Sequence, residues 1–278
     1  MFAGFKPDGK TVHKITSTSN PKFRNACRLH SSRGRRAQGK IIIFGCREVF
    51  RCLRLHSVDE LFVAPDQISP GDLQLVEEAV RNQDCPAYEL PGELLDKLNY
   101  GARSDGVVAV AKRPLTELDR LKPGSTGLLV VVEGVEKPGN LGAIVRTADA
   151  VGASGVVACG SGTDFFHPNS IRNSMGTVFS VPLAVDSVAN VQSWLEQQGC
   201  RILLAEAAAA ANFYDQDLRG PTAVVLGNES RGLSDDWMRP QYQPVALPMV
   251  GMADSLNVSV TASVMLFEAW RQRNDSPA

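Results

Sequence analysis

The spacing of hydrophobic and polar residues divides the chain into two stretches in which strands alternate with helices. In the first stretch, short apolar runs rich in β-branched residues are separated by amphipathic segments of helical period. This pattern predicts strands at 40–44, 60–64, 86–90 and 106–111 and helices at 20–31, 46–56, 71–82 and 91–98. We therefore expect a small α/β domain over residues 11–112.

A second stretch follows the segment "KRPLTELDRLKPGST", whose prolines, glycine and mixed charges are typical of a linker, here placed at 113–126. The unbroken run "GLLVVVEGV" then suits a strand that is buried on both faces. Further strands are predicted at "GVVAC", "FSVPLAV", "RILLAEA", "TAVVLG" and "QPVALP", with helices at 140–151, 188–198 and 255–272. The pattern predicts a second α/β domain over 127–273, with a mostly parallel sheet covered by helices on both sides.

Composition supports a globular chain of two domains. The chain has 278 residues, of which 44% are hydrophobic and 21% charged. No apolar run approaches the ~20 residues of a membrane-spanning helix. The six cysteines form no C-x-x-C pair and the four histidines lie away from them, so we expect neither a metal site nor a disulfide framework. Free cysteines fit a reducing compartment, which predicts a cytoplasmic location.

Charge is distributed very unevenly along the chain. Residues 1–56 hold 13 Lys and Arg against two acids, whereas the remaining residues hold 16 against 28. A basic segment gains affinity for phosphates by releasing their counterions, and Arg33, Arg35 and Arg36 are the predicted RNA contacts at its centre. A solvated surface and a mitochondrial transit peptide are the alternatives. RNA binding is favoured because strand-like "KIIIFG" and helix-like "CREVFRCLRLH" continue directly from the basic stretch.

The candidate chemistry lies in segments that leave the predicted strands, because ligands of parallel sheets bind beyond the carboxyl ends of the strands. Three such segments are unusual: "EKPGNLGAIVRTADAVGASG", "LGNESRGLS" and "LPMVGMADSLNVS". Each also has a purely structural interpretation. Arg146 can pair with Asp149, Ser234 can cap a turn, and Ser255 or Asn257 can cap the last helix.

Two common enzyme classes are disfavoured. No G-x-G-x-x-G follows a predicted strand, and "CGSGTDF" lacks the last glycine and the later acid of a dinucleotide site. "NESRG" is not the nucleophile elbow of a hydrolase, since Asn228 stands where that turn needs glycine. All four histidines also precede Ser230, whereas that class presents its histidine last. Neither a Rossmann dehydrogenase nor a serine hydrolase fits.

Taken together, the three segments resemble the motifs of the SpoU family of RNA ribose 2′-O-methyltransferases, a branch of the SPOUT superfamily. The matches are "N-x-G-x-x-x-R-T-A" at 140–148, "LGNE-x-x-GLS" at 226–234 and "LPM-x-G…SLNVS" at 247–259. Three separated motifs in the family's order make the resemblance specific. The N-terminal stretch is similar to the ribosomal-protein-like substrate-binding domain that many of these enzymes carry.

The resemblance implies a fold, a cofactor and a partner. SPOUT domains contain a deep trefoil knot, which is an exception to the rule that chains do not thread their own loops. The "LGNE" and "SLNVS" segments would form that knot. S-adenosylmethionine would be bound there mainly by backbone groups, at the positions Ala205, Gly227, Leu247 and Leu256. Family members are homodimers in which residues of the partner complete each site.

The resemblance also implies catalytic roles. Arg146 would carry the proton step, either as a perturbed base or as a charged group that stabilises the developing alkoxide. The residues that would orient Arg146 and the ribose are Asn140, Glu229, Ser255 and Asn257. Arg172, in "NSIRNSMG", is a predicted phosphate contact, with a structural ion pair as the alternative. No metal is implied.

The separate N-terminal domain favours ribosomal RNA over tRNA as the substrate. A tRNA methyltransferase, or an enzyme giving resistance to a ribosome-targeting antibiotic, is an alternative in the same class. A non-catalytic RNA-binding or ribosome-assembly protein with the same fold is a further alternative. It is disfavoured because all the polar positions of the three motifs are intact.

Overall fold

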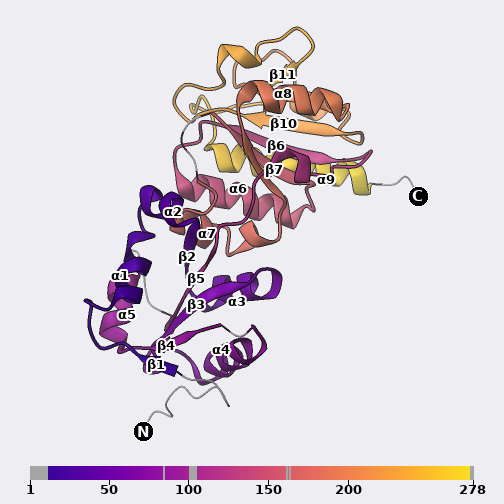
Figure 1. Cartoon of the computed structure of the whole chain (residues 1–278). Helices are drawn as coiled ribbons and strands as arrows, with labels where there is room; N and C mark the ends of the chain where they lie inside the picture. The colour runs from indigo at the N-terminus through magenta and orange to yellow at the C-terminus, as the bar shows by residue number, and fades with distance from the viewer. Residues whose placement is uncertain (1–11, 84, 100–104, 161, 163, 276–278) are drawn as a thin grey trace. The chain divides into compact units, whose positions relative to one another are not determined.

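The computed structural model describes residues 12–83, 85–99, 105–160, 162 and 164–275 (Figure 1). The chain divides into two compact units. The first comprises Met1–Pro114 and Phe166–Ser180, and the second comprises Leu115–Phe165 and Val181–Ala278. The predicted linker is therefore split after Pro114. The segment 166–180, which stands between two strands of the second unit in the sequence, packs with the first unit.

The first unit contains a five-stranded mixed sheet in the order β1-β4-β3-β5-β2. Its strands are β1 (Val12–Lys14), β2 (Lys40–Phe44), β3 (Val58–Val63), β4 (Ala87–Glu89) and β5 (Val107–Lys112). The first three in this order are parallel, whereas β5 is antiparallel to both of its neighbours. The sequence did not predict β1, since its three residues carry no alternation of apolar and polar side chains.

Helices cover this sheet, and they include two that the sequence pattern missed. They are α1 (Pro21–Arg28), α2 (Ser32–Gln38), α3 (Cys46–Leu55), α4 (Pro70–Gln83), α5 (Gly92–Leu98) and α7 (Pro168–Asn173). Apolar residues of α1 and α5 pack on the β2, β3 and β5 side chains to form the core of the unit. The missed helices, α2 and α7, are short and polar, so periodicity could not identify them.

A sharp corner separates α1 from α2, where the sequence predicted a single helix over 20–31. Ser31 caps α2 by accepting a hydrogen bond from the Gly34 amide at 3.0 Å. A Cβ at Gly34 would lie 1.8 Å from the Arg28 carbonyl oxygen, so only glycine permits this close approach of α1 and α2. The second helix therefore begins where the sequence predicted the first to end.

The second unit contains a six-stranded sheet in the order β11-β9-β10-β6-β7-β8. Its strands are β6 (Leu128–Glu133), β7 (Gly155–Cys159), β8 (Leu183–Asp186), β9 (Arg201–Ala205), β10 (Thr222–Leu226) and β11 (Gln243–Val245). All five pairings between these strands are parallel, which confirms the predicted sheet type. The strands are fully buried along most of their length, as expected of a sheet covered on both faces.

Helices cover both faces of this second sheet. Helix α8 (Val188–Gln197) lies on one face, and α6 (Pro138–Ala150) and α9 (Val258–Asn274) lie on the other (Figure 1). Helix α9 packs against α6 and β10. Alternate strand residues such as Val131 and Val225 meet Val191 and Leu195 of α8 in one apolar core. None of the helices in the described part of the chain is long and apolar enough to cross a membrane.

The last helix is fixed at both of its ends. Asn257 caps its start, because Oδ1 accepts from the Ser259 amide at 2.9 Å. Near its end, Arg273 donates to the carbonyl oxygens of Leu218 and Gly220, both at 2.7 Å, and of Thr126. The helix thus begins three residues later than the predicted 255, and Ser255 stays in the preceding loop.

Candidate functional site

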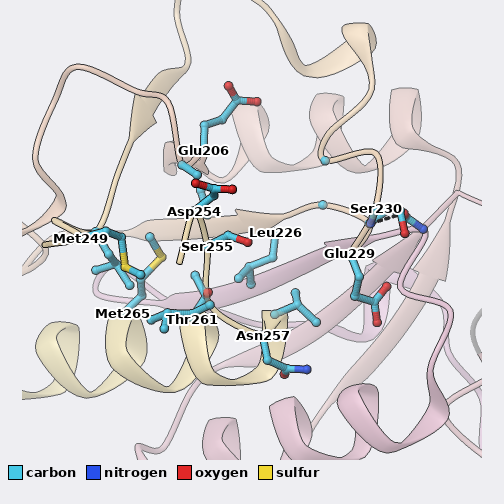
Figure 2. A pocket seen from close by; sticks show the side chains of 18 of the residues that line it. Glu206, Leu226, Glu229, Ser230, Met249, Asp254, Ser255, Asn257, Thr261 and Met265 are labelled. Atoms are coloured by element: carbon cyan, nitrogen blue, oxygen red, sulfur yellow. Dashed lines mark hydrogen bonds between the residues drawn. The ribbon is translucent and has the colours of Figure 1, made fainter. Parts of the chain in front are cut away.

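A cavity of about 440 Å³ lies at the carboxyl ends of β9, β10 and β11 (Figure 2). Each of the three unusual segments contributes to its lining, the first through Lys137. Its apolar lining comprises Leu226, Val245, Leu247, Met249, Leu256 and Met265. Its polar lining includes Lys137, Glu206, Glu229, Asp254, Ser255 and Asn257. The predicted position of the site, beyond the strand ends of a parallel sheet, therefore coincides with a cavity.

All four positions predicted to bind the cofactor line this cavity: Ala205, Gly227, Leu247 and Leu256. Gly227 has a specific steric role. An added Cβ would lie 2.3 Å from the carbonyl carbon of Gly232, so a side chain would collide with the backbone of the turn. That turn is closed by two backbone hydrogen bonds of 3.0 Å between Asn228 and Gly232. The tight turn holds the "LGNE" segment against the cavity.

A chain of hydrogen bonds joins one residue from each motif. Asn140 Nδ2 donates to Glu229 Oε1 at 2.8 Å, and Asn257 Nδ2 reaches Asn140 Oδ1 at 3.4 Å. The Glu136 amide also donates to Glu229 Oε2, at 3.4 Å. Residues 89 and 117 positions apart are thereby brought together. Asn257 has two functions here, since its oxygen caps α9 while its amide nitrogen points to Asn140.

The environment of Glu229 favours the charged carboxylate. Partial burial, the largest single influence, opposes ionisation. The hydrogen bonds from Asn140 and from the backbone, together with the charge of Lys137, outweigh it and lower the pKa of Glu229 below its ordinary value. Glu229 is therefore an acceptor that holds Asn140 in place, and it is a weak base at neutral pH.

Arg146 does not lie in the cavity of its own chain. It is exposed on α6, roughly 9 Å further along the helix axis than Asn140 at 1.5 Å per residue. In the described part of the chain, no hydrogen bond or ion pair engages its guanidinium, so the alternative pairing with Asp149 is not formed. Arg146 is left available for a group outside its own chain.

Several cavity residues were not predicted. Glu206 follows β9 directly, so the rule that ligands bind beyond strand ends could have identified it. Asp254 and Lys137 are close in sequence to motif residues, but neither is one of the positions from which the site residues were predicted. Figure 2 shows Glu206 and Asp254 at one end of the cavity and Glu229 and Asn257 at the other. Met265, one helical turn beyond Thr261, also lines the cavity and lies beside Met249 (Figure 2).

The predicted RNA contacts lie in the first unit and are of two kinds. Arg33 and Arg36 are exposed on α2, and Arg172 is exposed on α7 without an ion pair to any described residue. Arg35 is different, because it is 1% exposed and donates to the Leu29 and His30 carbonyl oxygens at 3.0 and 2.9 Å. The expectation that Arg35 contacts RNA was wrong, since its guanidinium instead satisfies the carbonyls at the end of α1.

The residues of the cavity fit S-adenosylmethionine. Its volume falls within the roughly 300–1,000 Å³ of small-molecule sites. Apolar walls from Leu226, Leu247 and Met265 suit an adenine ring. The carboxylates of Glu206 and Asp254 suit hydroxyl or ammonium donors. Among the described residues, no group of three or more His, Cys, Asp or Glu is arranged to hold a metal ion.

Comparison with known proteins gives consistent matches. Residues 127–267 match the model of the SpoU rRNA Methylase family. A curated 23S rRNA (uridine(2479)-2'-O)-methyltransferase of Streptomyces viridochromogenes is 32% identical over 94% of this chain and 93% of its own length. The 23S rRNA (guanosine-2'-O-)-methyltransferase RlmB of Pseudomonas syringae is 39% identical over 56% of this chain and 64% of its own.

A solved structure extends the similarity to almost the whole chain. The SpoU methyltransferase AviRb of S. viridochromogenes, in complex with AdoMet, is similar to this chain with a TM-score of 0.85 and 28% identity. The match covers 92% of this chain and 99% of that one. Fold and site together define an RNA methyltransferase that uses S-adenosylmethionine. The chain belongs to the SpoU rRNA Methylase family, which confirms the family predicted from the three motifs.

Proposed function

We propose that this protein transfers the methyl group of S-adenosylmethionine to a ribose 2′-hydroxyl of ribosomal RNA. The observation that carries the proposal is a cavity lined by residues of the second and third motifs, to which Asn140 of the first motif is joined through its hydrogen bonds with Glu229 and Asn257. The strongly basic first 56 residues support a large RNA substrate. The similarity to enzymes named for 23S rRNA supports the same class.

The chemistry asks the protein mainly to position groups. The cofactor supplies an activated methyl group, so the chain must hold the 2′-hydroxyl at roughly 3 to 3.5 Å from it and stabilise the oxygen as its proton leaves. We assign that stabilisation to a charged Arg146, since a guanidinium is essentially never deprotonated in proteins. Glu229 and Asn257 orient Asn140, which is then fixed to bind the ribose.

Transfer of labelled methyl groups tests this proposal. Purified protein is incubated with labelled S-adenosylmethionine and, separately, with ribosomal RNA and bulk tRNA. We expect label in ribosomal RNA, at a ribose 2′-oxygen. Label in tRNA alone would contradict ribosomal RNA as the substrate and support the alternative, a tRNA methyltransferase. Absence of label in either RNA from a protein that binds the cofactor would support the non-catalytic alternative.

We also propose a homodimer in which a partner copy completes each site. Two observations support it. The outward face of α9 carries three exposed apolar side chains, Val260, Phe267 and Trp270, which have 46%, 50% and 45% exposure. Exposed apolar stripes of this kind mark association surfaces. Arg146 is also absent from the cavity of its own chain, so a partner's Arg146 is a natural source of the missing charge.

Mixed dimers test the shared site. Arg146→Ala and Glu229→Gln are each expected to inactivate a homodimer. Co-expression of the two variants should restore transfer in the mixed dimer if Arg146 and Glu229 of one site come from different copies. No recovery in a verified mixed dimer would place both residues in the same chain. Phe267→Glu should convert the dimer to monomers in sedimentation.

Two further features follow from family membership and remain proposals. We place the protein in the cytoplasm, which is supported by six free cysteines. We also propose the trefoil knot implied by the family, with the "LGNE" and "SLNVS" segments as its parts; both segments border the same cavity. Slow refolding of the unfolded chain would be consistent with threading of that knot.

A further inference from the structure

The first unit contains a second cavity, beside α3. It has a volume of about 770 Å³, and we name it the α3 groove. Its walls include Arg47, Phe50, Arg51 and Arg54 of α3, with Asp72 and Asp105 from other segments. Residues spaced by four and three positions share one face of a helix, so the three arginines form a row. None of the residues predicted from the sequence as RNA contacts belongs to this groove.

The three arginines differ in how they are held. Arg47 pairs at 3.0 Å with the buried carboxylate of Glu48. Arg51 Nη1 donates to the Met175 carbonyl oxygen at 2.8 Å, so its guanidinium is fixed in place. Arg54 is exposed and makes no hydrogen bond or ion pair with any residue that the structure describes. Among the described residues that line it, the groove thus presents two anchored arginines and, in Arg54, one that is free of such contacts.

Hydrogen-bond acceptors are combined with these cations. Asp72 Oδ2 accepts from Ser69 Oγ at 2.7 Å, and a carboxylate oxygen has room for a further donor. Burial, followed by the charges of Asp72 and Asp105, raises the pKa of the Cys46 thiol to about 12. Cys46 is therefore a protonated thiol, which donates to the Asp105 carbonyl at 3.2 Å and is neither a nucleophile nor a metal ligand.

The half-buried ring of Phe50 completes the set of groups. An aromatic ring beside arginines is a platform on which an unstacked base can lie. A track for a run of phosphates would be uniformly basic, whereas here carboxylates stand in the same groove as the arginines. Carboxylates accept the N–H donors of a base edge, and arginines donate to phosphate. This mixture fits one nucleotide rather than a duplex backbone.

We propose that the α3 groove binds one unpaired nucleotide of the substrate RNA, with the base on Phe50 and the flanking phosphate at Arg54. The carboxylates of Asp72 and Asp105 select a base that offers N–H donors. This inference rests on the proposed function, because it assigns part of the same RNA to the first unit. It adds a recognition site for a nucleotide other than the one that is methylated.

Fluorescence anisotropy of the full-length protein with a short unstructured RNA tests the groove. We expect Phe50→Leu to weaken binding about tenfold through loss of base stacking, and Arg54→Ala to weaken it by a similar factor through loss of a phosphate contact. Arg54→Ala should also reduce the log–log salt slope by about 0.7. Lys14→Ala, an exposed cation on the edge strand β1, is the matched control and should change binding little.

The outcomes separate the groove from the proposed function. Equal weakening by Arg54→Ala and Lys14→Ala, or equal competition by double-stranded RNA, would overturn the groove as a nucleotide site. Thermal unfolding of Phe50→Leu checks that this half-buried position still folds, and exposed Arg54 provides the same test without that concern. Calorimetry with S-adenosylmethionine reports the other site. If the unsubstituted protein does not bind S-adenosylmethionine, the proposed function is contradicted. If Arg54→Ala and Phe50→Leu bind RNA as tightly as the unsubstituted protein, only the proposal for the α3 groove is contradicted.

Discussion

Asn257 illustrates how one side chain serves both folding and chemistry. Its oxygen caps α9 through the Ser259 amide, and its nitrogen lies 3.4 Å from Asn140 Oδ1. From the sequence, a cap and a site residue were competing interpretations of the same position. The structure satisfies both, because an amide carries an acceptor and a donor on opposite sides.

Substitution of Asn257 can separate these two functions. Serine is a good N-cap but lacks the amide donor, so Asn257→Ser should keep the free energy of unfolding within about 0.5 kcal/mol. The same variant should lose methyl transfer, because Asn140 is no longer oriented. Asn257→Ala should lose methyl transfer as well as the helix cap, which lowers the free energy of unfolding by about 1 kcal/mol. Denaturant unfolding and single-turnover transfer measure the pair. An active serine variant would show that the contact with Asn140 is dispensable.

Arg146 is the side chain on which the proposed chemistry depends most. Arg146→Ala should reduce the transfer rate by two to three orders of magnitude, about 3 to 4 kcal/mol, with stability and cofactor binding unchanged. Arg146→Lys distinguishes the two roles. A lysine gives up a proton far more easily, so recovery at raised pH would indicate a base, whereas no recovery supports the charged planar group. If the single-turnover rate of Arg146→Ala lies within about tenfold of that of the unsubstituted protein, Arg146 has no catalytic role.

Arg35 and Arg36 are adjacent in the sequence but should respond oppositely to substitution. Arg35→Ala removes the donor to the buried carbonyl of Leu29 and to the partly buried carbonyl of His30, so we expect about 2 to 3 kcal/mol of destabilisation. Arg36→Ala, at an exposed position, should leave stability unchanged and weaken RNA binding. Chemical unfolding and RNA titration of both variants provide the comparison. Equal stability of the two would contradict the structural role of Arg35.

The pKa of Glu229 predicts how its contribution to stability depends on pH. Its folded-state pKa is lowered, so the charged form stabilises the fold above the ordinary carboxyl pKa, and this stabilisation is lost as pH falls through the folded pKa. The destabilisation caused by Glu229→Gln should therefore be present at neutral pH and disappear in acid. Unfolding curves over this pH range test the sign. A difference that grows in acid would contradict it.

At the scale of elements, strands buried on both faces were the easiest to predict. The predicted bounds of β2 and β7 agree with the observed ones, because each is a β-branched run bounded by glycine. The ends of helices were harder to predict, because they are set by contacts that a local sequence pattern does not show. The break between α1 and α2 follows from the approach of Gly34 to Arg28, and the start of α9 is set by its cap.

The turn after β10 is the element whose shape most directly maintains the cavity. Gly227→Ala places a methyl group against the backbone of Gly232, and the turn must shift to accommodate it. We expect cofactor affinity to fall at least tenfold, while the sheet, whose core lies elsewhere, stays folded. Gly220→Ala, where an added Cβ meets nothing within 4 Å, is the matched control. Calorimetry with S-adenosylmethionine measures both, and equal affinities would show that the turn tolerates the shift.

At the scale of the molecule, motif order and charge distribution predicted the class, and packing determined the rest. The three motifs predicted the family, which is confirmed, and the four positions predicted to bind the cofactor all line one cavity. The assignment of 166–180 to the first unit was not predictable, because no local signal separates this segment from its neighbours. The α3 groove was also not predicted. Its side chains come from α3, from the start of α4 and from the segment before β5, which are distant from one another in the sequence.

The central claim is that this chain methylates a ribose of ribosomal RNA. Mapping 2′-O-methylation across ribosomal RNA and tRNA, in cells with and without the gene, tests it most directly. We predict that one 2′-O-methyl group in ribosomal RNA disappears without the gene, returns with the unsubstituted protein and does not return with Arg146→Ala. Identical methylation maps with and without the gene, or a lost mark confined to tRNA, would contradict the account.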